Sequence, residues 1–383
     1  MKTLANPKTL KHSIAIKMLC LATLTSVLFF GCRKESDPMA DKPDAPSSGM
    51  SVKAKPDITV QQGGSIQSAV DAAEPGSLIK IMPGVYNESI MVTKEGITIK
   101  GTGNVIINNP GELEDGINVR PGANNFTLEN VTIQNFKENG VFLVRVDNFV
   151  LRNVTTTNNG EYGLFPVVCT NGKIEHCTAS GHSDTGIYVG QSTDIEISHS
   201  TAFANVLGIE VENCSRVTVS QNHTYDNVTG ILAVLLPQLS RKESSDIWIS
   251  KNIVSDNNHI NFAPQDGGFE SVVPSGVGIL IVGTDRTTVE QNQVNGNKFI
   301  GIGVFSALTI GQLANIPPEA FDIEPNADFA KILNNNLVKN GTGPSPLPFL
   351  PAVDLIWDGS GTANCWSGNN FTSSVPSPLP SCN

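Results

Sequence analysis

A glycine followed by alternating apolar residues recurs through the middle of this chain every 22 to 24 residues. The repeated segments are Gly116-Ile-Asn-Val, Gly140-Val-Phe-Leu, Gly163-Leu-Phe-Pro, Gly186-Ile-Tyr-Val, Gly208-Ile-Glu-Val and Gly230-Ile-Leu-Ala. Gly278-Ile-Leu-Ile lies 48 residues after Gly230, which we interpret as two periods with insertions, and Gly301-Ile-Gly-Val lies 23 residues further on. Each period also holds a second alternating segment, such as residues 126–133 or 217–222.

This period, filled by short alternating segments without an amphipathic helix, predicts an all-β fold with one coil of a parallel β-helix per repeat. Successive coils would lie about 4.8 Å apart, so that residues at the same position of each coil stack in rows. Leucine-rich repeats have a similar period, but their asparagine-centred leucine signature is absent from this chain. We therefore predict a solenoid over residues 58–345.

Residues 64–101, with the run Gly64-Ser-Ile-Gln-Ser-Ala-Val, resemble the first coil of pectin-lyase-like right-handed parallel β-helices. Ser65 is placed to cap a short helix that ends near Glu74, and this N-terminal helix would close the open end of the solenoid. The resemblance implies a right-handed fold. It implies no single reaction, because that superfamily contains lyases, hydrolases, epimerases, adhesins and non-enzymatic proteins.

A closer resemblance rests on Tyr162-Gly-Leu-Phe-Pro-Val and Ser183-Asp-Thr-Gly-Ile-Tyr-Val-Gly-Gln-Ser. It continues in Gly208-Ile-Glu-Val-Glu-Asn and Thr229-Gly-Ile-Leu. These segments are similar to a group of exported bacterial β-helix repeat proteins whose activity is not established. This resemblance therefore sharpens the expected fold and leaves the reaction open.

The N-terminal segment predicts where the protein resides. Residues 1–31 hold four lysines, no acidic residue and the apolar run Met18–Phe30, which is shorter than the about 20 residues that a membrane-spanning helix needs. This pattern is typical of a secretory signal peptide. Leu28-Phe-Phe-Gly-Cys32 resembles a bacterial lipobox, which implies that Cys32 is lipidated; the alternative is a plain signal peptide with an incidental cysteine.

Residues 32–57 are rich in Asp, Pro, Ser and Lys and predict a flexible tether. We thus expect a lipid-anchored monomer in the bacterial cell envelope, at the outer membrane, the cell surface or in the periplasm. The formal net charge of -11 argues against binding to a nucleic acid, since that would need a basic face.

The C-terminal residues 346–383 break the period, and we expect them to form a cap or tail. Cys365 and Cys382 close a short loop, and in an oxidising compartment they are expected to form a disulfide. Cys169 and Cys214 share a position but lie two coils apart, about 9.6 Å, which is beyond disulfide reach. Cys177 aligns with valines of earlier coils and is expected in the core.

The residues most suited to chemistry fall on the outward positions of the glycine-anchored strands. Residues one and three after each glycine should point inward, and those two and four after it outward. A row of acids also stands two residues before four of the glycines, at Glu114, Glu138, Glu161 and Asp184. These rules bring together candidate catalytic residues, Asp184, Tyr188 and Glu210, and candidate substrate-binding residues, Glu161, Phe165, His182, Glu212 and Arg145.

Three insertions, at residues 237–246, 258–275 and 308–327, would flank the same face and wall a groove for a polysaccharide. Aromatic rings there would stack on sugars, while carboxylates would bind hydroxyl groups, act as acid or base, or hold Ca²⁺. The sequence does not identify a cofactor. The Asp-Pro-His-Asp motif of mannuronan epimerases is absent, and the acidic character fits neutral glycans better than acidic polymers.

Less specific interpretations remain open. Outward Phe142, Phe165 and Leu232 would also be explained if the insertions simply cover them, and the stacked acids if they are solvated or hold a structural cation. His176 and His199 share a position and are able to bind a metal together, although such a row is more typical of a turn. The leading hypothesis is a carbohydrate-binding or carbohydrate-processing protein (lyase, hydrolase or epimerase type). The alternative is a non-catalytic surface or assembly protein.

Overall fold

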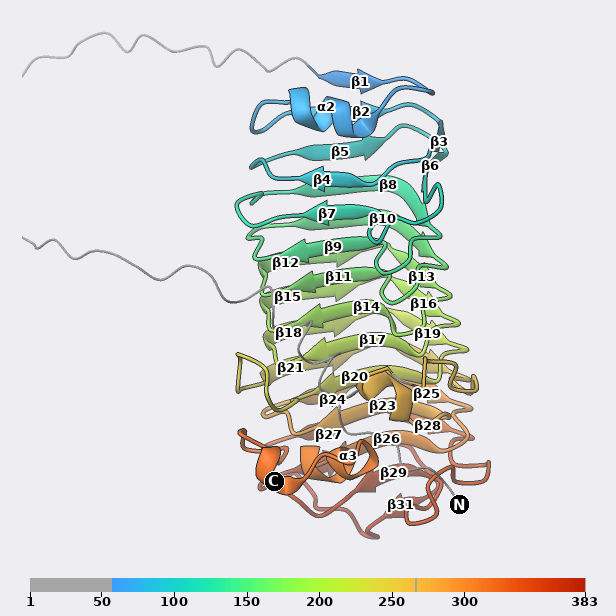
Figure 1. Ribbon diagram of the computed structural model, residues 1–383. Helices are drawn as coiled ribbons and strands as arrows, with labels where there is room; N and C mark the ends of the chain where they lie inside the picture. The colour runs from blue at the N-terminus through green and yellow to red at the C-terminus, as the bar shows by residue number, and fades with distance from the viewer. Residues whose placement is uncertain (1–56, 266, 383) are drawn as a thin grey trace, which may run out of the picture. The chain divides into compact units, whose positions relative to one another are not determined.

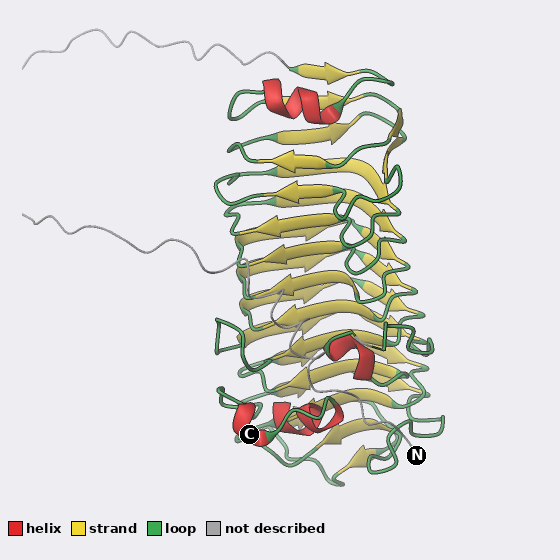
Figure 2. Ribbon diagram, viewed as in Figure 1, coloured by secondary structure: helices red, strands yellow, loops and turns green. Residues whose placement is uncertain are grey.

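The computed structural model describes residues 57–265 and 267–382. Within them the chain winds as a parallel β-helix whose coils stack along one axis (Figures 1 and 2). Cys32, the expected signal peptide and most of the expected tether lie outside the described residues. In the described part of the chain, no helix has the length and apolar character needed to cross a membrane.

One side of the solenoid is an 11-stranded sheet, called sheet 1 below. Its strands, in order, are β4 (Ile90–Val92), β7 (Ile117–Val119), β9 (Val141–Val144), β11 (Leu164–Val167), β14 (Thr185–Gly190), β17 (Leu207–Glu212), β20 (Thr229–Val234), β23 (Val277–Val282), β26 (Ile300–Phe305), β29 (Val353–Trp357) and β31 (Ser374–Val375).

The other two sides belong to a 20-stranded sheet, called sheet 2. One side holds β1 (Ile58–Val60), β2 (Leu78–Ile81), β5 (Thr98–Gly101), β8 (Thr127–Gln134), β10 (Val150–Thr157), β12 (Thr170–Glu175), β15 (Thr193–Ser198), β18 (Ser215–Ser220), β21 (Ser245–Ser250), β24 (Thr288–Glu290), β27 (Lys331–Leu333) and β30 (Cys365–Ser367). The other holds β3 (Gly84–Tyr86), β6 (Val105–Asn108), β13 (Thr178–Ser180), β16 (Thr201–Phe203), β19 (His223–Tyr225), β22 (Ile253–Ser255), β25 (Gln293–Asn295) and β28 (Asn336–Val338). Strands β8 and β10 run through the corner between them.

Four short helices complete the described elements: α2 (Ile66–Ala72), α3 (Ala307–Leu313), and the 3₁₀ helices η2 (Phe269–Val272) and η3 (Pro318–Ala320). As predicted, Ser65 caps α2 by accepting a hydrogen bond from the backbone N–H of Ser68 (3.1 Å). The apolar side of α2, which includes Ile66 and Val70, is buried against the first coil. The helix therefore covers the apolar end of the solenoid.

Rows of buried asparagines line two inner corners of the coils. One row is Asn205, Asn227, Asn257, Asn297 and Asn340, and the other is Asn222, Asn252, Asn292 and Asn335. The backbone N–H of Asn205 donates to Asn227 Oδ1 (3.0 Å), while Asn227 Nδ2 donates to the carbonyl oxygen of Ala202 (2.9 Å). Each amide thus satisfies backbone groups that would otherwise be buried without a partner where the chain turns.

Glycine is required where each coil enters sheet 1. A Cβ on Gly163 would lie 2.4 Å from the carbonyl oxygen of Gly186, and one on Gly186 would lie 2.7 Å from Asn205 Nδ2. Both separations are far shorter than van der Waals contact. The repeated glycine of the sequence is therefore the residue that lets this corner pack against the next coil.

Two sequence expectations about the coils are wrong. Strand β20 pairs directly with β23, for example Ile231 with Ile279, so the 48 residues from Gly230 to Gly278 form one enlarged coil and not two periods. The solenoid also continues beyond residue 345, because β29 pairs with β26 and β30 pairs with β27. The proline-rich segment before β29 obscured these coils in the sequence.

Cysteines lie as their positions in the repeat predict. A disulfide joins Cys365 to Cys382 and fastens the last residues to β30. Cys169, Cys177 and Cys214 are free and buried. Burial raises the pKa of each of these three thiols to about 12, so they remain protonated and take part in the core.

The asparagine rows give a stability prediction. We expect Asn227→Ala to lower the free energy of unfolding by about 3 kcal/mol, because it leaves the Asn205 N–H and the Ala202 carbonyl buried without partners. The exposed Asn104 is a matched control whose change to alanine should cost no more than about 0.5 kcal/mol. Urea unfolding measures both. Equal effects of the two changes would contradict the role assigned to the row.

Candidate functional site

The outer face of sheet 1 follows the predicted alternation after each glycine. In β14, Ile187 and Val189 point into the core and are fully buried, while Tyr188 points outward and donates a hydrogen bond to Glu212 Oε1 (2.6 Å). The in-register pairing places Tyr188 beside Glu210, and Phe165 beside Phe142. Outward side chains from different coils are thereby brought together.

The residue just before each glycine also faces outward, which strict alternation did not predict. Because the glycine itself turns toward the inner corner, the preceding residue is rotated onto the outer face. Tyr162 and Thr185 occupy this position, and both contact residues of the outward rows. Both residues lie within the repeated motifs, but the alternation rule does not assign them to the site.

An aromatic cluster covers the outer face of β9, β11 and β14. The ring of Phe165 stacks on Tyr162 (centroids 4.2 Å apart, planes 11° apart) and on Phe142 (5.2 Å, 23°). Tyr188 meets the edge of Phe165 at 4.8 Å. Phe142 and Phe165 are only half-buried, so this part of the cluster offers aromatic surface to a ligand.

Two candidate catalytic carboxyl groups share one hydroxyl group. Thr185 Oγ1 lies 3.0 Å from Asp184 Oδ1 and 2.7 Å from Glu210 Oε2. A threonine hydroxyl has a single proton, so it donates to only one of these oxygens at a time. All three side chains are buried. Thr185 therefore couples two acidic side chains that are 26 positions apart in the sequence.

Electrostatics keep the two tyrosines of the cluster protonated. Burial, followed by the Glu212 carboxylate, raises the pKa of Tyr188 well above its ordinary value. Burial, followed by Asp184, does the same to the pKa of Tyr162. Tyr188 is thus held as a neutral phenol that donates to Glu212. We define the strip as Phe142, Tyr162, Phe165, Asp184, Thr185, Tyr188, Glu210 and Glu212.

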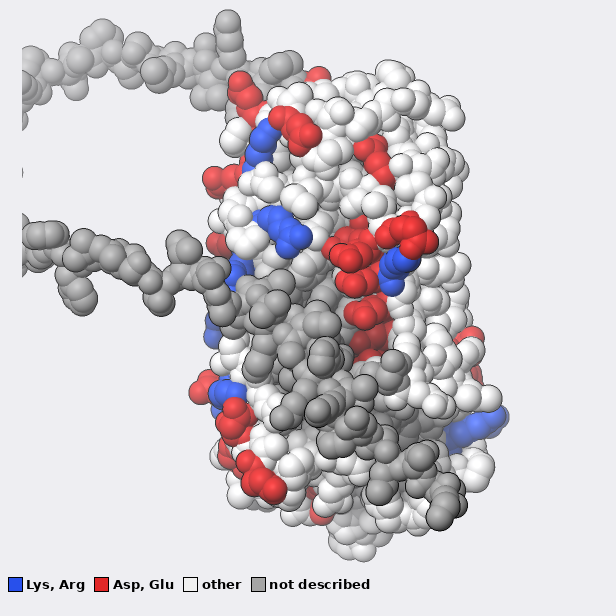
Figure 3. Space-filling view, viewed as in Figure 1, with Lys and Arg blue, Asp and Glu red and all other residues white. Residues whose placement is uncertain are grey.

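A row of acids borders the strip, stacked two residues before the glycines. The backbone N–H of Glu138 donates to the Glu114 carbonyl, that of Glu161 to Glu138, and that of Asp184 to Glu161. Figure 3 shows acidic side chains in a column on this face, at the level of β9 to β17. Desolvation, with repulsion from Glu161 and Glu114, raises the pKa of Glu138 to about 7.

On sheet 2, acidic side chains form ion pairs with basic side chains of neighbouring coils. Arg152 contacts Glu129 (2.7 Å) and Glu175 (2.5 Å) from the two neighbouring coils. Lys100 also contacts Glu129 (2.9 Å), and its hydrogen bond is the main cause that lowers the pKa of Glu129, with a smaller contribution from Arg152. The acids of sheet 2 thus serve to hold coils together, whereas the row beside the strip accumulates negative charge.

Two expected site residues lie elsewhere. His182 is fully buried in the inner corner, where its Nδ1 contacts the Asn159 carbonyl (3.1 Å) and its Nε2 contacts Thr156 Oγ1 (3.2 Å). Burial lowers the pKa of His182 to about 4, so it stays neutral. Arg145 is exposed at the far end of β9, three coils and about 14 Å from the level of Glu212. The other predicted residues do gather around the strip, with Glu161 exposed at its border.

The histidine pair belongs to a turn. His176 and His199 are exposed, their rings are parallel at 5.0 Å, and both have a left-handed backbone with φ of 55° and 51°. Their neighbours in the row, including Asn153 and Gln221, share this conformation. The alignment of the two histidines is therefore explained by the turn between β12 and β13, which recurs at the same place in the neighbouring coils.

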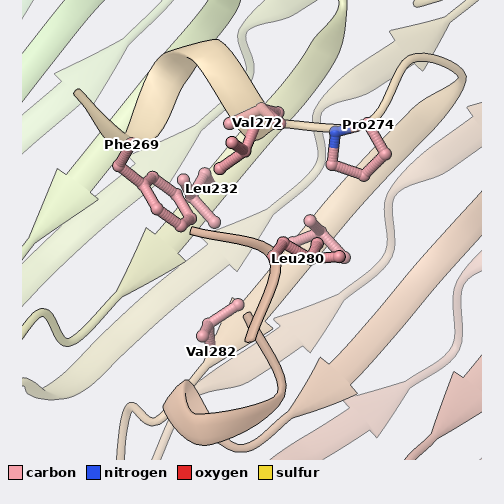
Figure 4. A pocket seen from close by; sticks show the side chains of 8 residues that line it. Leu232, Phe269, Val272, Pro274, Leu280 and Val282 are labelled. Atoms are coloured by element: carbon pink, nitrogen blue, oxygen red, sulfur yellow. The ribbon is translucent and has the colours of Figure 1, made fainter. Parts of the chain in front are cut away.

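The insertions cover the C-terminal half of sheet 1. Leu232 and Leu280 point outward but are 1% and 3% exposed, because Phe269, Val273 and Leu313 pack over them. Figure 4 shows Phe269 and Val272 of η2 next to Leu232, with Leu280 and Val282 lower in the view. The insertions thus explain why the outward side chain of Leu232 is buried. Phe142 and Phe165 lie toward the half of sheet 1 that the insertions leave uncovered.

Comparison with known proteins identifies the fold. Residues 89–235 match a family model described as the right handed beta helix region. A search of curated proteins found no match. The solved structure of a mannuronan C-5 epimerase A-module from Azotobacter vinelandii is similar, with 14% identity, a TM-score of 0.58, and 83% of this chain and 93% of that chain covered. The chain folds as a right-handed parallel β-helix.

Two further structures are similar at comparable levels. A DFA-IIIase from Arthrobacter chlorophenolicus in complex with GF2 has 12% identity and a TM-score of 0.52, covering 83% of this chain and 92% of that one. A GH136 lacto-N-biosidase from Eubacterium ramulus has 12% identity and a TM-score of 0.53, covering 82% of this chain and 68% of that one. At these identities the likeness establishes the fold alone, as the sequence resemblance had implied.

The raised pKa of Glu138 predicts a pH dependence. A carboxyl whose pKa is about 7 when folded, against an ordinary 4.5, binds its proton more tightly in the folded state, so stability falls as pH rises through this interval. Glu138→Gln should reduce this fall, so that the free energy of unfolding decreases less between pH 5 and pH 8 in the variant than in the wild type. Unfolding at both pH values tests this, with Glu196→Gln on sheet 2 as the control. A wild-type-like pH slope in Glu138→Gln would refute it.

Proposed function

We propose that the strip binds and processes carbohydrate, with Asp184 and Glu210 as its acid–base pair. The observation that carries the proposal is the placement of stacked aromatic rings directly beside two carboxyl groups joined by Thr185. Aromatic faces bind the apolar faces of sugar rings, while carboxylates accept hydrogen bonds from sugar hydroxyls. Phe165 supplies the half-buried ring surface, Glu212 supplies an oxygen within the strip, and Glu161 supplies one at its border.

The shared hydroxyl gives the carboxyl pair a chemical role. Because both carboxylate oxygens contact Thr185 Oγ1, they lie no more than about 6 Å apart, a limit that is compatible with the about 5–5.5 Å between the two carboxyl groups of retaining glycosidases. One carboxyl would protonate the leaving oxygen while the other attacks or stabilises the sugar carbon. Tyr188, fixed by Glu212, would orient the sugar.

The acidic row suits a neutral substrate. A polymer of uronic acids would be repelled by Glu138, Glu161 and Asp184, whereas a neutral glycan would meet only hydrogen-bond acceptors. The similar structures support the carbohydrate class: their names describe a mannuronan epimerase, a DFA-IIIase bound to GF2 and a lacto-N-biosidase. The alternative of an apolar docking strip is weakened by the insertions, which cover Leu232 and Leu280.

Substitutions in the strip should separate binding from turnover. In a screen of neutral oligosaccharides, Asp184→Asn and Glu210→Gln are expected to reduce turnover at least about a hundredfold, as for loss of a general acid or base. Phe165→Ala should weaken binding about tenfold, the loss of one stacking ring. Glycan-array binding and product analysis by chromatography measure these effects.

The control is Trp248→Ala on sheet 2, which removes an aromatic side chain that is 49% exposed and distant from the strip. It should leave both properties unchanged. Turnover retained in Asp184→Asn and Glu210→Gln would exclude the acid–base assignment. Binding without any turnover would instead indicate a non-catalytic carbohydrate-binding protein, and neither binding nor turnover would favour the surface or assembly hypothesis.

We also propose that the protein is anchored to the bacterial envelope by lipid on Cys32, on the basis of the Leu28–Cys32 segment. Metabolic labelling with a radioactive fatty acid should mark the wild-type protein, and Cys32→Ser should abolish the label and release the protein from the membrane fraction. Cys177→Ser, which changes a buried thiol, is the control. Unlabelled wild-type protein would favour the plain signal peptide.

A further inference from the structure

The outward rows of sheet 1 change from polar to apolar residues beyond β14. The acids that stand two residues before the glycine end at Asp184, and the next coil has Val206 at this position. The row just before the glycine changes from Thr185 to Leu207, its in-register neighbour. Val206 and Leu207 are no more than 1% exposed and belong to the apolar cluster that includes Val273 of the second insertion. Two of the rows that build the strip thus end immediately beyond its carboxyl groups.

The insertion at residues 258–275 forms a wall at this end of the strip. Its Phe269 and Pro274 lie against Leu232, which is the in-register neighbour of Glu210 in the next strand (Figure 4). The wall is fastened to sheet 1, because Thr229 Oγ1 of β20 donates a hydrogen bond to the Pro274 carbonyl oxygen (3.0 Å). Neighbouring strands lie about 4.8 Å apart, so only about one coil separates Glu210 from the wall.

A second insertion lies along one side of the strip, where the strands of sheet 1 end. The segment 237–246 folds back toward β14, and Ser240 Oγ donates a hydrogen bond to Oε1 of Gln191, the residue directly after β14 (2.6 Å). The third insertion holds this segment in place, because Asp322 Oδ1 accepts a hydrogen bond from the backbone N–H of Gln238 (2.8 Å). The strip is therefore bounded at one end and along one side.

The accessible part of the strip lies on the other side of the acid–base pair. Along the outward row, Phe142 and Phe165 are half-buried, whereas Tyr188 is 5%, Glu210 4% and Leu232 1% exposed. Ring surface on which a sugar can stack is therefore available toward the N-terminal coils. Toward the C-terminal coils the same row is covered by the wall.

We propose that the strip accepts the end of a neutral glycan chain and that hydrolysis there releases one terminal unit at a time. The chain lies along Phe142 and Phe165, and its terminal unit occupies the single coil between the acid–base pair and the wall. A site for the interior of a chain would need open surface on both sides of Asp184 and Glu210, and the wall removes one of them. The inference rests on the proposed function and adds which part of the chain the strip binds.

The hydrolysis needs only water as a co-reactant. One carboxylate of the Asp184 and Glu210 pair attacks the anomeric carbon, and the bond from this carbon to the bridging oxygen breaks. The other carboxyl group gives its proton to that oxygen. A water molecule then attacks the anomeric carbon and releases the first carboxylate, while its proton returns to the second one. Both groups regain their starting state, and water has been added across one glycosidic bond.

The first products formed from linear hexasaccharides test the proposal. Glucan, mannan, xylan, galactan and fructan hexasaccharides are incubated with the full chain, and early products are identified by chromatography with mass spectrometry. The wild type should release only a monosaccharide and a pentasaccharide at first. The double variant Phe269→Ala with Val272→Ala lowers the wall, so disaccharide and tetrasaccharide should appear in addition. Trp248→Ala on sheet 2 is the control and should keep the wild-type pattern.

A binding measurement supports this test and does not depend on turnover. Size-fractionated polysaccharides of the same five classes are titrated with the wild type in the analytical ultracentrifuge. The number of protein molecules bound per chain should stay constant as the chain lengthens, because every linear chain has the same number of ends. Circular dichroism establishes that the wall variant is folded; if it is not, the wild-type products and this stoichiometry still decide the matter.

The outcomes separate this inference from the function on which it rests. Early trisaccharide or tetrasaccharide from the wild type, or a bound number that rises in proportion to chain length, overturns end-specific binding and leaves the carbohydrate function intact. If no probe is bound or hydrolysed, the carbohydrate function is overturned, and end-specific binding with it.

Discussion

The close contact of successive coils at the glycine corner is the constraint on which the rest of this structure depends. At Gly163 and Gly186 the neighbouring backbone lies where a side chain would begin, and the buried asparagines satisfy the backbone groups that this packing removes from water. Coils so closely fitted stack in register, as the pairing of Ile187 with Ile209 shows. Position in the coil therefore determines position in space.

The strip follows from that register. Thr185 contacts Glu210 and Tyr188 contacts Glu212, in each case from one coil to the next. The inward turn of the glycine rotates the preceding residue outward, which adds Tyr162 and Thr185 to a face otherwise built by alternation. Side chains that are distant in sequence thus form one continuous surface, which the acidic row borders.

The sequence was sufficient to predict the coil, the capping helix at Ser65, the position of Tyr188 beside Glu210, and the pairing of Cys365 with Cys382. It did not predict the enlarged coil between Gly230 and Gly278, because two insertions imitate a second period. His182 was misplaced because the turn between β13 and β14 brings it into the inner corner. Tyr162 and Thr185 were missed because their orientation depends on the local rotation of the backbone at the glycine, which a rule of simple alternation does not include.

A crystal structure with a bound neutral oligosaccharide tests most directly whether the strip is a carbohydrate site. We predict a sugar ring in contact with the exposed surface of Phe142 and Phe165, with sugar oxygens within hydrogen-bonding distance of Asp184 or Glu210. A sugar bound elsewhere on the solenoid, or a segment of the protein itself packed over Phe142 and Phe165 where the sugar should lie, would contradict it.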